Sequence, residues 1–192
     1  LMLGKKSGMM IGSMASYTNN KNAVMQNSRL QDYRLKGMDH AIFADFRTFL
    51  TERAYLNLSL RYQTDKLEYE NSNKKELDFT KDFNGLYPTM NLAYTFDKKK
   101  GRMLSLGYRY YQSFPNFGYF FDVKEVYSDN SYSIGNPNLD PEHFHLAELT
   151  YTHNKALNFV YSYRRGTDLV QVMTFTEEEN PLVSYTKPEN IG

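Results

Sequence analysis

The chain has 192 residues, a formal net charge of +1 and no cysteine, so it offers neither a strong field to attract nucleic acid nor any disulfide or thiolate site. The mean hydropathy is −0.66, and no run approaches the ~18 apolar residues that a transmembrane helix needs. We therefore expect no nucleic-acid partner and no helical membrane span.

Seven segments alternate apolar and polar side chains with period 2, which indicates β-strands rather than helices. Residues 54–66 show the pattern clearly, with Leu58 and Leu60 on one face and Ser59 and Arg61 on the other. Successive strand side chains point to opposite faces, so one face suits an apolar solvent and the other suits water. The predicted strands cover residues 8–17, 38–50, 54–69, 87–96, 103–112, 144–152 and 157–175, the last interrupted near Gly166.

Tight turns and long polar loops alternate strictly between these strands. The predicted turns are residues 51–53, 97–102 and 153–156, and the predicted loops are residues 18–37, 70–86, 113–143 and 176 onward. Loops of that length are uncommon in compact soluble domains, whereas outer-membrane β-barrels have short turns on one side and long loops on the other. The predicted fold is all-β, an antiparallel meander of long amphipathic strands that forms part of an outer-membrane β-barrel.

The predicted strand count is odd, whereas single-chain bacterial barrels have an even number of strands. The sequence starts at Leu1 without a secretory signal, and residues 187–192 look like the approach to a further strand. We therefore expect residues 1–192 to be one partial β-barrel domain, truncated at both ends.

Sequence motifs support this reading. The segment 135–142, GNPNLDPE, followed by AELTY at residues 147–151, resembles the "GNPxLxPE…ELxY" signature of TonB-dependent outer-membrane receptors. The order and spacing of the motifs are similar to those of the barrel type common in Bacteroidetes proteins with a carboxypeptidase-like amino-terminal domain. Further strand motifs of this family resemble LRY at residues 60–62, YPT at 87–89, YRY at 108–110 and FPNF at 114–117.

The resemblance implies a barrel of about 22 strands with a plug in its lumen. It implies import of a scarce ligand of the siderophore, glycan or peptide class across the outer membrane of a Gram-negative bacterium. The implied partners are outer-membrane lipid, this ligand, and the TonB complex acting through an amino-terminal part that the sequence lacks. The sequence contains no plug domain, so the resemblance assigns it part of the transmembrane barrel.

The end of the loop at residues 113–143 is predicted to form a turn that orders the loop base. Gly135 tolerates positive φ, Pro137 and Pro141 fix φ and lack a donor, and Asn136 and Asp140 can bond their own backbone. A structural turn is the preferred interpretation, and direct ligand contact is the alternative. The predicted turn motif comprises Gly135, Asn136, Pro137, Asp140, Pro141 and Glu142.

Polar side chains of the strands are predicted to line the lumen, because Arg or Lys on the lipid face near the midplane costs ~2–4 kcal/mol. Pairing with the plug or with neighbours is the preferred role, and lining a ligand path is the alternative. Rings of the loop at residues 113–143 are expected either to stack on a ligand or to pack the loop on itself. The predicted lumen-lining residues are Asp45, Arg47, Asn57, Arg61, Asn91 and Arg109; the predicted ligand-loop residues are Phe114, Phe117, Tyr119, Phe120, Phe121 and Tyr127.

No catalytic constellation stands out, so we expect no enzyme activity and no cofactor. His143 and His145 have no acidic or cysteine partner at metal-ligand spacing, and we expect interface histidines rather than a metal site. The rival hypothesis is a soluble or surface β-sandwich that binds a ligand and packs its apolar stripes sheet on sheet. A third hypothesis is an adhesin or assembly barrel without a plug.

Overall fold

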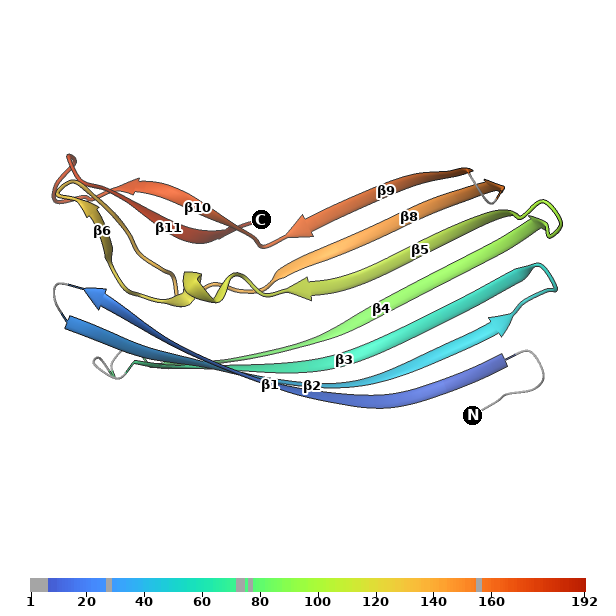
Figure 1. The fold of residues 1–192 in the computed structure, drawn as a ribbon, viewed down its shortest axis with the longest axis horizontal. Coiled ribbons are helices and arrows are strands. Elements are labelled where there is room, and N and C mark those ends of the chain that lie inside the picture. Colours follow the sequence, from blue (N-terminus) through green and yellow to red (C-terminus); the bar gives the residue numbers. More distant parts are fainter. Residues whose placement is uncertain (1–6, 27–28, 72–74, 76–77, 155–156) are drawn as a thin grey trace.

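A computed structural model describes the chain except for residues 1–6, 27–28, 72–74, 76–77 and 155–156. In the described part, seven strands form one antiparallel sheet in the order β1-β2-β3-β4-β5-β8-β9. Figure 1 shows them as a curved wall, which confirms the predicted meander. The strands are β1 (Ser7–Gln26), β2 (Arg29–Phe49), β3 (Ala54–Asn71), β4 (Phe79–Asp97), β5 (Arg102–Ser113), β8 (Glu142–Asn154) and β9 (Leu157–Thr167).

The sheet has the predicted two faces, because the register keeps like side chains opposite one another. Leu58 pairs with Phe46 on β2 and with Met90 on β4, and these side chains lie on what we call the apolar face. Asn57 pairs with Asn91, and these lie on the polar face. A one-residue slip would exchange the two faces, so the pattern seen in the sequence fixes the pairing.

The apolar face is uncovered. Ile11 is 73 %, Ile42 61 % and Tyr161 71 % exposed, and in the described chain no second sheet packs over this face. A β-sandwich buries its apolar stripes between two sheets. The rival hypothesis of a β-sandwich is therefore wrong.

Two of the predicted loops are strands over most of their length. β1 and β2 pair without interruption from Ser7 with Thr48 to Gln26 with Arg29, and β4 begins at Phe79. Polar residues follow one another in the sequence of these outer segments, so the period-2 signal disappears although the backbone ladder continues. The predicted loops at residues 18–37 and 70–86 are wrong to this extent, and parts of both lie outside the described residues.

The tight turns lie together at the opposite end of the wall from the long loops (Figure 1). Thr51 Oγ1 accepts the backbone N–H of Ala54 at 3.0 Å. Asp97 Oδ1 accepts that of Lys99 at 2.9 Å, and Gly101 has a φ of 67°. The predicted turns at residues 51–53 and 97–102 are thereby confirmed; the third predicted turn lies partly outside the described residues.

The last predicted strand is divided in two. The break falls at Asp168, which has a φ of 56°, two residues beyond the predicted position. Beyond it, β10 (Leu169–Thr176) leaves the first sheet and pairs with β11 (Ser184–Ile191). The predicted loop from residue 176 onward therefore contains a strand.

The loop at residues 113–143 is also structured. It contains the 3₁₀ turn η2 (Phe117–Phe120) and the short strands β6 (Glu125–Ser128) and β7 (Ser131–Ser133). Within the described residues, β10, β11, β7 and β6 form a second sheet at the loop end of the wall. No helix in the part of the chain that the structure describes is long and apolar enough to cross a membrane.

The hydrophobic core lies between this loop and the polar face. Leu67 and Tyr69 are on the same face as Arg61 because even spacing separates them, and they pack against Phe120 and Phe121 of the loop. The loop thus covers the outer end of the polar face. The other buried members of the cluster are Leu35, Val123 and Leu139.

Candidate functional site

All predicted lumen-lining residues lie on the polar face. Arg47 pairs with Asn57, and Asn57 pairs with Asn91, across three neighbouring strands. The others lie on the same face because an even number of residues separates them from a member of that face. That these residues line a lumen or a ligand path stays a prediction. The full set is Asp45, Arg47, Asn57, Arg61, Asn91 and Arg109.

A groove of about 580 Å³ is hollowed into the polar face across β2, β3, β4 and β5; we call it the wall groove. Arg61 and Arg109 line it, and none of its described lining residues is acidic. Rings and amides complete the lining, so the wall groove combines positive charge with aromatic surface. These further side chains include Phe43, Gln63, Tyr87, Tyr111, Gln112 and Phe114.

Neither arginine forms an ion pair among the described residues. The Arg109 guanidinium carbon lies 5.1 Å from the centre of the Tyr111 ring, a distance typical of a cation–π contact. The buried Nε of Arg61 has no hydrogen-bond partner in the described structure. Because an unsatisfied buried donor costs ~1–3 kcal/mol, Arg61 favours a further polar or anionic partner.

A hydrogen-bonded network joins three strands beside the wall groove. Asp65 is only 4 % exposed and accepts hydrogen bonds from Gln63 Nε2, at 2.5 Å, and from Gln112 Nε2. Gln112 Oε1 in turn accepts the hydroxyl of Tyr87. Sequence reasoning missed Asp65 and Gln112, because alternation assigns a face but does not name partners on strands far apart in sequence.

The predicted ligand-loop rings divide into covered and exposed members. Phe120 is fully buried in the core, and the Phe114 ring lies 5.5 Å from that of Phe83. Tyr119 and Tyr127 are 37 % and 67 % exposed. Packing of the loop is thus the observed role of the phenylalanines, which include the partly buried Phe117 and the buried Phe121. Ligand contact stays a prediction, and the two tyrosines are its accessible candidates.

The predicted turn motif begins with a glycine that has a different role from the one expected. Gly135 does not have a positive φ, which among the described glycines occurs at Gly101. A Cβ at Gly135 would lie 2.1 Å from the Phe121 carbonyl oxygen. The glycine is thus needed for this close approach and not for the positive φ that it could tolerate.

The rest of the motif anchors the loop to distant strands. Asn136 Nδ2 donates to the carbonyl oxygen of Pro188 and to Glu189 Oε2, both at 3.0 Å. Asp140 exchanges two hydrogen bonds with Asn190, of 2.9 and 3.1 Å. Glu142 Oε1 accepts the backbone N–H of Val170 at 3.0 Å. The other members are Pro137, half-buried, and Pro141, buried just before β8.

Lys81 connects the motif to the first sheet. Its Nζ donates to the Leu139 carbonyl oxygen at 2.7 Å and lies 3.5 Å from Asp140 Oδ1. Lys81 shares the polar face with Phe83, so a cation of the wall reaches the loop base. No pattern in the sequence indicates this contact, since a lysine side chain is ordinarily solvated.

The two histidines lie against a tyrosine ring. The rings of His143 and His145 stack on Tyr110 with centroid distances of 5.9 and 4.6 Å. His143 Nδ1 also lies 3.4 Å from Asp168 Oδ2, at the break between β9 and β10. Among the described residues, no three His, Cys, Asp or Glu side chains are grouped to hold a metal ion.

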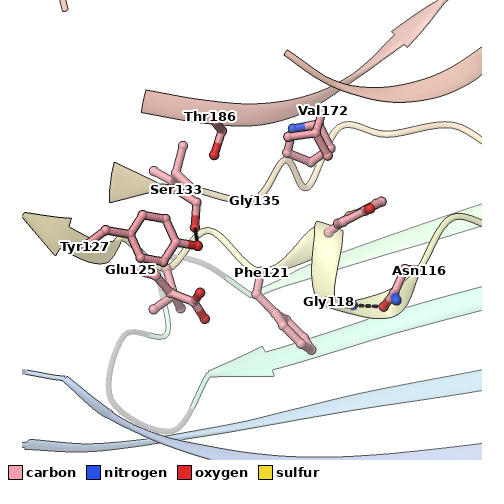
Figure 2. A pocket seen from close by; sticks show the side chains of 13 residues that line it. Asn116, Gly118, Phe121, Glu125, Tyr127, Ser133, Gly135, Val172 and Thr186 are labelled. Atoms are coloured by element: carbon pink, nitrogen blue, oxygen red, sulfur yellow. Dashed lines mark hydrogen bonds between the residues drawn. The ribbon is translucent and has the colours of Figure 1, made fainter. Parts of the chain in front are cut away.

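A second hollow, of about 480 Å³, lies between residues 116–123 of the loop and the second sheet; we call it the loop cavity. Figure 2 shows the Tyr127 ring and the Thr186 side chain turned toward it, whereas the Phe121 ring points away into the core. The Tyr127 and Ser133 hydroxyl groups lie 3.0 Å apart. Glu125 is the one ionisable acid or base among its described lining residues other than tyrosines.

The opposite face of the second sheet carries a stack of rings. Tyr132 stacks on Tyr185 at 5.1 Å, and Tyr185 stacks on Phe175 at 5.4 Å. Lys124 Nζ lies 3.5 Å above the Tyr132 ring. Desolvation, together with a hydrogen bond to Glu177, raises the pKa of Tyr132 to about 12, so this hydroxyl stays neutral at physiological pH.

Comparison with known proteins identifies a family and a similar solved structure. The model of the family described as "Outer membrane protein beta-barrel family" matches residues 7–192. The crystal structure of the siderophore receptor PirA from Pseudomonas aeruginosa is similar, with a TM-score of 0.50 and 8 % sequence identity over 99 % of this chain and 49 % of that one. The chain thus spans about half the length of that receptor, and the likeness concerns the fold. None of the curated protein sequences matches.

Proposed function

Because the chain belongs to the outer membrane protein beta-barrel family, we propose that it forms part of the transmembrane barrel of a TonB-dependent receptor. The family places the chain in the outer membrane of a Gram-negative bacterium. In the proposal, the receptor imports a scarce nutrient of the siderophore, glycan or peptide class and has no enzyme activity of its own.

The observation that carries the proposal is that the two faces of one sheet suit two different solvents. The apolar face exposes large side chains such as Ile42 and Tyr161, which suits lipid, because lipid-facing and lumen-facing residues alternate in such barrels. The polar face presents unpaired arginines in the wall groove, which suits an aqueous lumen occupied by a ligand or by another part of the protein.

Two further features favour a receptor over a simple pore. The loop at residues 113–143 folds over the outer end of the polar face, where Lys81 of β4 bonds it, and Asn136 and Asp140 tie it to β11 of the second sheet. In the proposed barrel this loop partly covers the mouth. The GNPNLDPE motif that forms this anchor resembles the signature of TonB-dependent receptors of the Bacteroidetes type. The PirA fold agrees with this proposal at the level of the barrel wall.

Deletion of the gene tests the proposal. A deletion strain should lose growth on one limiting nutrient among chelated iron, oligosaccharides and peptides, and plasmid-borne full-length protein should restore it. Restoration should also require an intact TonB complex. Equal growth of the deletion and parent strains on all three nutrient classes would contradict import, and growth rescue without TonB would favour a plug-less barrel.

A further inference from the structure

The loop cavity has the walls of a preformed binding site. Backbone hydrogen bonds from Gly135 to Phe121 (3.0 Å), from Asn136 to Tyr119 (2.6 Å) and from Ile134 to Thr186 (3.0 Å) join the two sides. Its volume of about 480 Å³ lies within the range of small-molecule sites, which are usually formed before the ligand binds.

The charges around the loop cavity disfavour an anionic ligand. Glu125 is exposed and forms no ion pair among the described residues. The nearby cations belong to the other face of the second sheet. Lys124 lies over the Tyr132 ring, and Lys187, which alternates with Thr186 and Pro188, lies 2.6 Å from Glu189. A carboxylated or phosphorylated ligand would therefore meet a negative charge without a compensating cation.

The remaining lining combines exposed ring surface with hydroxyl groups. Tyr127 is 67 % exposed, and Ser133 and Thr186 bring two hydroxyls to the same cavity. A tyrosine ring offers a rigid apolar surface with a polar tip, and a carboxylate accepts strong hydrogen bonds from ligand hydroxyls. A ring face beside several acceptors fits a sugar, which has C–H faces and hydroxyl edges.

We propose that the loop cavity binds a neutral, hydroxyl-rich ligand, namely an uncharged oligosaccharide. The ring of Tyr127 stacks on a sugar face, while Glu125 and the hydroxyls of Ser133 and Thr186 bond its edge. The inference rests on the proposed import function, because it names the glycan class as the nutrient first captured at the outer mouth.

The test uses full-length protein purified in detergent and an array of neutral, sulfated and uronic-acid oligosaccharides, followed by calorimetric titration of the neutral oligosaccharide retained best. Neutral oligosaccharides should be retained over the anionic ones. Tyr127→Ala should weaken binding about tenfold, and Glu125→Gln should weaken it several-fold. Tyr127→Phe, which keeps the ring, should retain most of the affinity, so that a loss in the alanine variant is assigned to the ring and not to the hydroxyl group.

Val126→Ala is the matched control, because Val126 lies between the two tested residues on the other face of β6. Its affinity should equal that of the unaltered protein. Retention of no neutral oligosaccharide, a preference for anionic ones, or an equal loss in Val126→Ala would overturn the inference. If the protein binds no glycan but the deletion strain loses import of iron or peptides, the receptor proposal stands and the glycan inference fails. If the protein binds a neutral glycan but the deletion strain shows no import defect, the receptor proposal fails and the binding site stands.

Discussion

At the scale of single residues, the base of the loop at residues 113–143 depends on the absence of a side chain at Gly135. Gly135 packs its α-carbon against the chain at Phe121, and its N–H donates to the same carbonyl oxygen that a side chain would strike. Turn chemistry in the sequence indicates that a glycine belongs here but does not distinguish positive φ from close approach. The distinction needs the position of Phe121, fourteen residues earlier.

Gly135→Ala should destabilise the loop by ~1–3 kcal/mol, because the added Cβ meets backbone that cannot rotate away. Hydrogen exchange of residues 113–142 in the full-length protein should rise. Gly8→Ala is the matched control, since a Cβ at Gly8 meets nothing within 4 Å. Equal protection of the loop in both variants would show that the close approach is relieved by a small backbone shift.

The network around Asp65 holds β5 to β3 at the point where the β4–β5 ladder ends, at Thr89 with Arg109. Gln112→Ala should lower stability by ~1–3 kcal/mol, because it leaves Asp65 and Tyr87 without a shared partner. The midpoint of heat-induced unfolding in detergent measures the effect. Gln171→Ala, at an exposed position of β10, should leave the midpoint unchanged; a matching fall in both variants would remove the special role of Gln112.

At the scale of elements, the sequence predicts the strands where one face is apolar and fails where both faces are polar. The stretch from Ala54 to Tyr62 alternates cleanly and is assigned correctly, as are the turns at Thr51 and Asp97. The outer parts of β1, β2 and β4 are stabilised by backbone pairing, which the hydropathy pattern of a sequence does not detect. The same limit applies to the site: the predicted polar-face residues are found on one face, whereas Asp65, Gln112 and Lys81 act through partners set by the tertiary fold.

The break between β9 and β10 depends on the left-handed backbone of Asp168. Asp168→Val should destabilise this region by ~1–3 kcal/mol, because a β-branched side chain disfavours φ near 56°. Hydrogen exchange measures this destabilisation, and it should become faster across residues 169–191 in Asp168→Val. Asp168→Asn tolerates the same backbone and is the control; it also removes the carboxylate facing His143. If both variants lose protection alike, the contact between the Asp168 carboxylate and His143, rather than the backbone, controls the break.

At the scale of the whole molecule, the described wall has two edges, β1 and β9, and an uncovered apolar face. Unpaired edges and large apolar patches promote association. The 192-residue chain produced alone should therefore associate in water and become smaller in detergent while remaining β-rich, as measured by light scattering and circular dichroism. A monodisperse β-rich monomer in plain buffer would contradict a lipid-facing role of the apolar face.

Neighbouring residues of β3 offer the sharpest test of which solvent each face meets. Leu58 lies on the apolar face between Phe46 and Met90, and Ser59 lies on the polar face and lines the wall groove. In a membrane, Leu58→Arg should cost ~2–4 kcal/mol, whereas an arginine in the lumen stays hydrated. The folded fraction of full-length protein in outer-membrane extracts should thus fall for Leu58→Arg and stay near normal for Ser59→Arg. The reverse order would place lipid on the polar face. Because the register fixes the faces of each strand relative to those of its neighbours, that result would invert the assignment of faces for the whole wall.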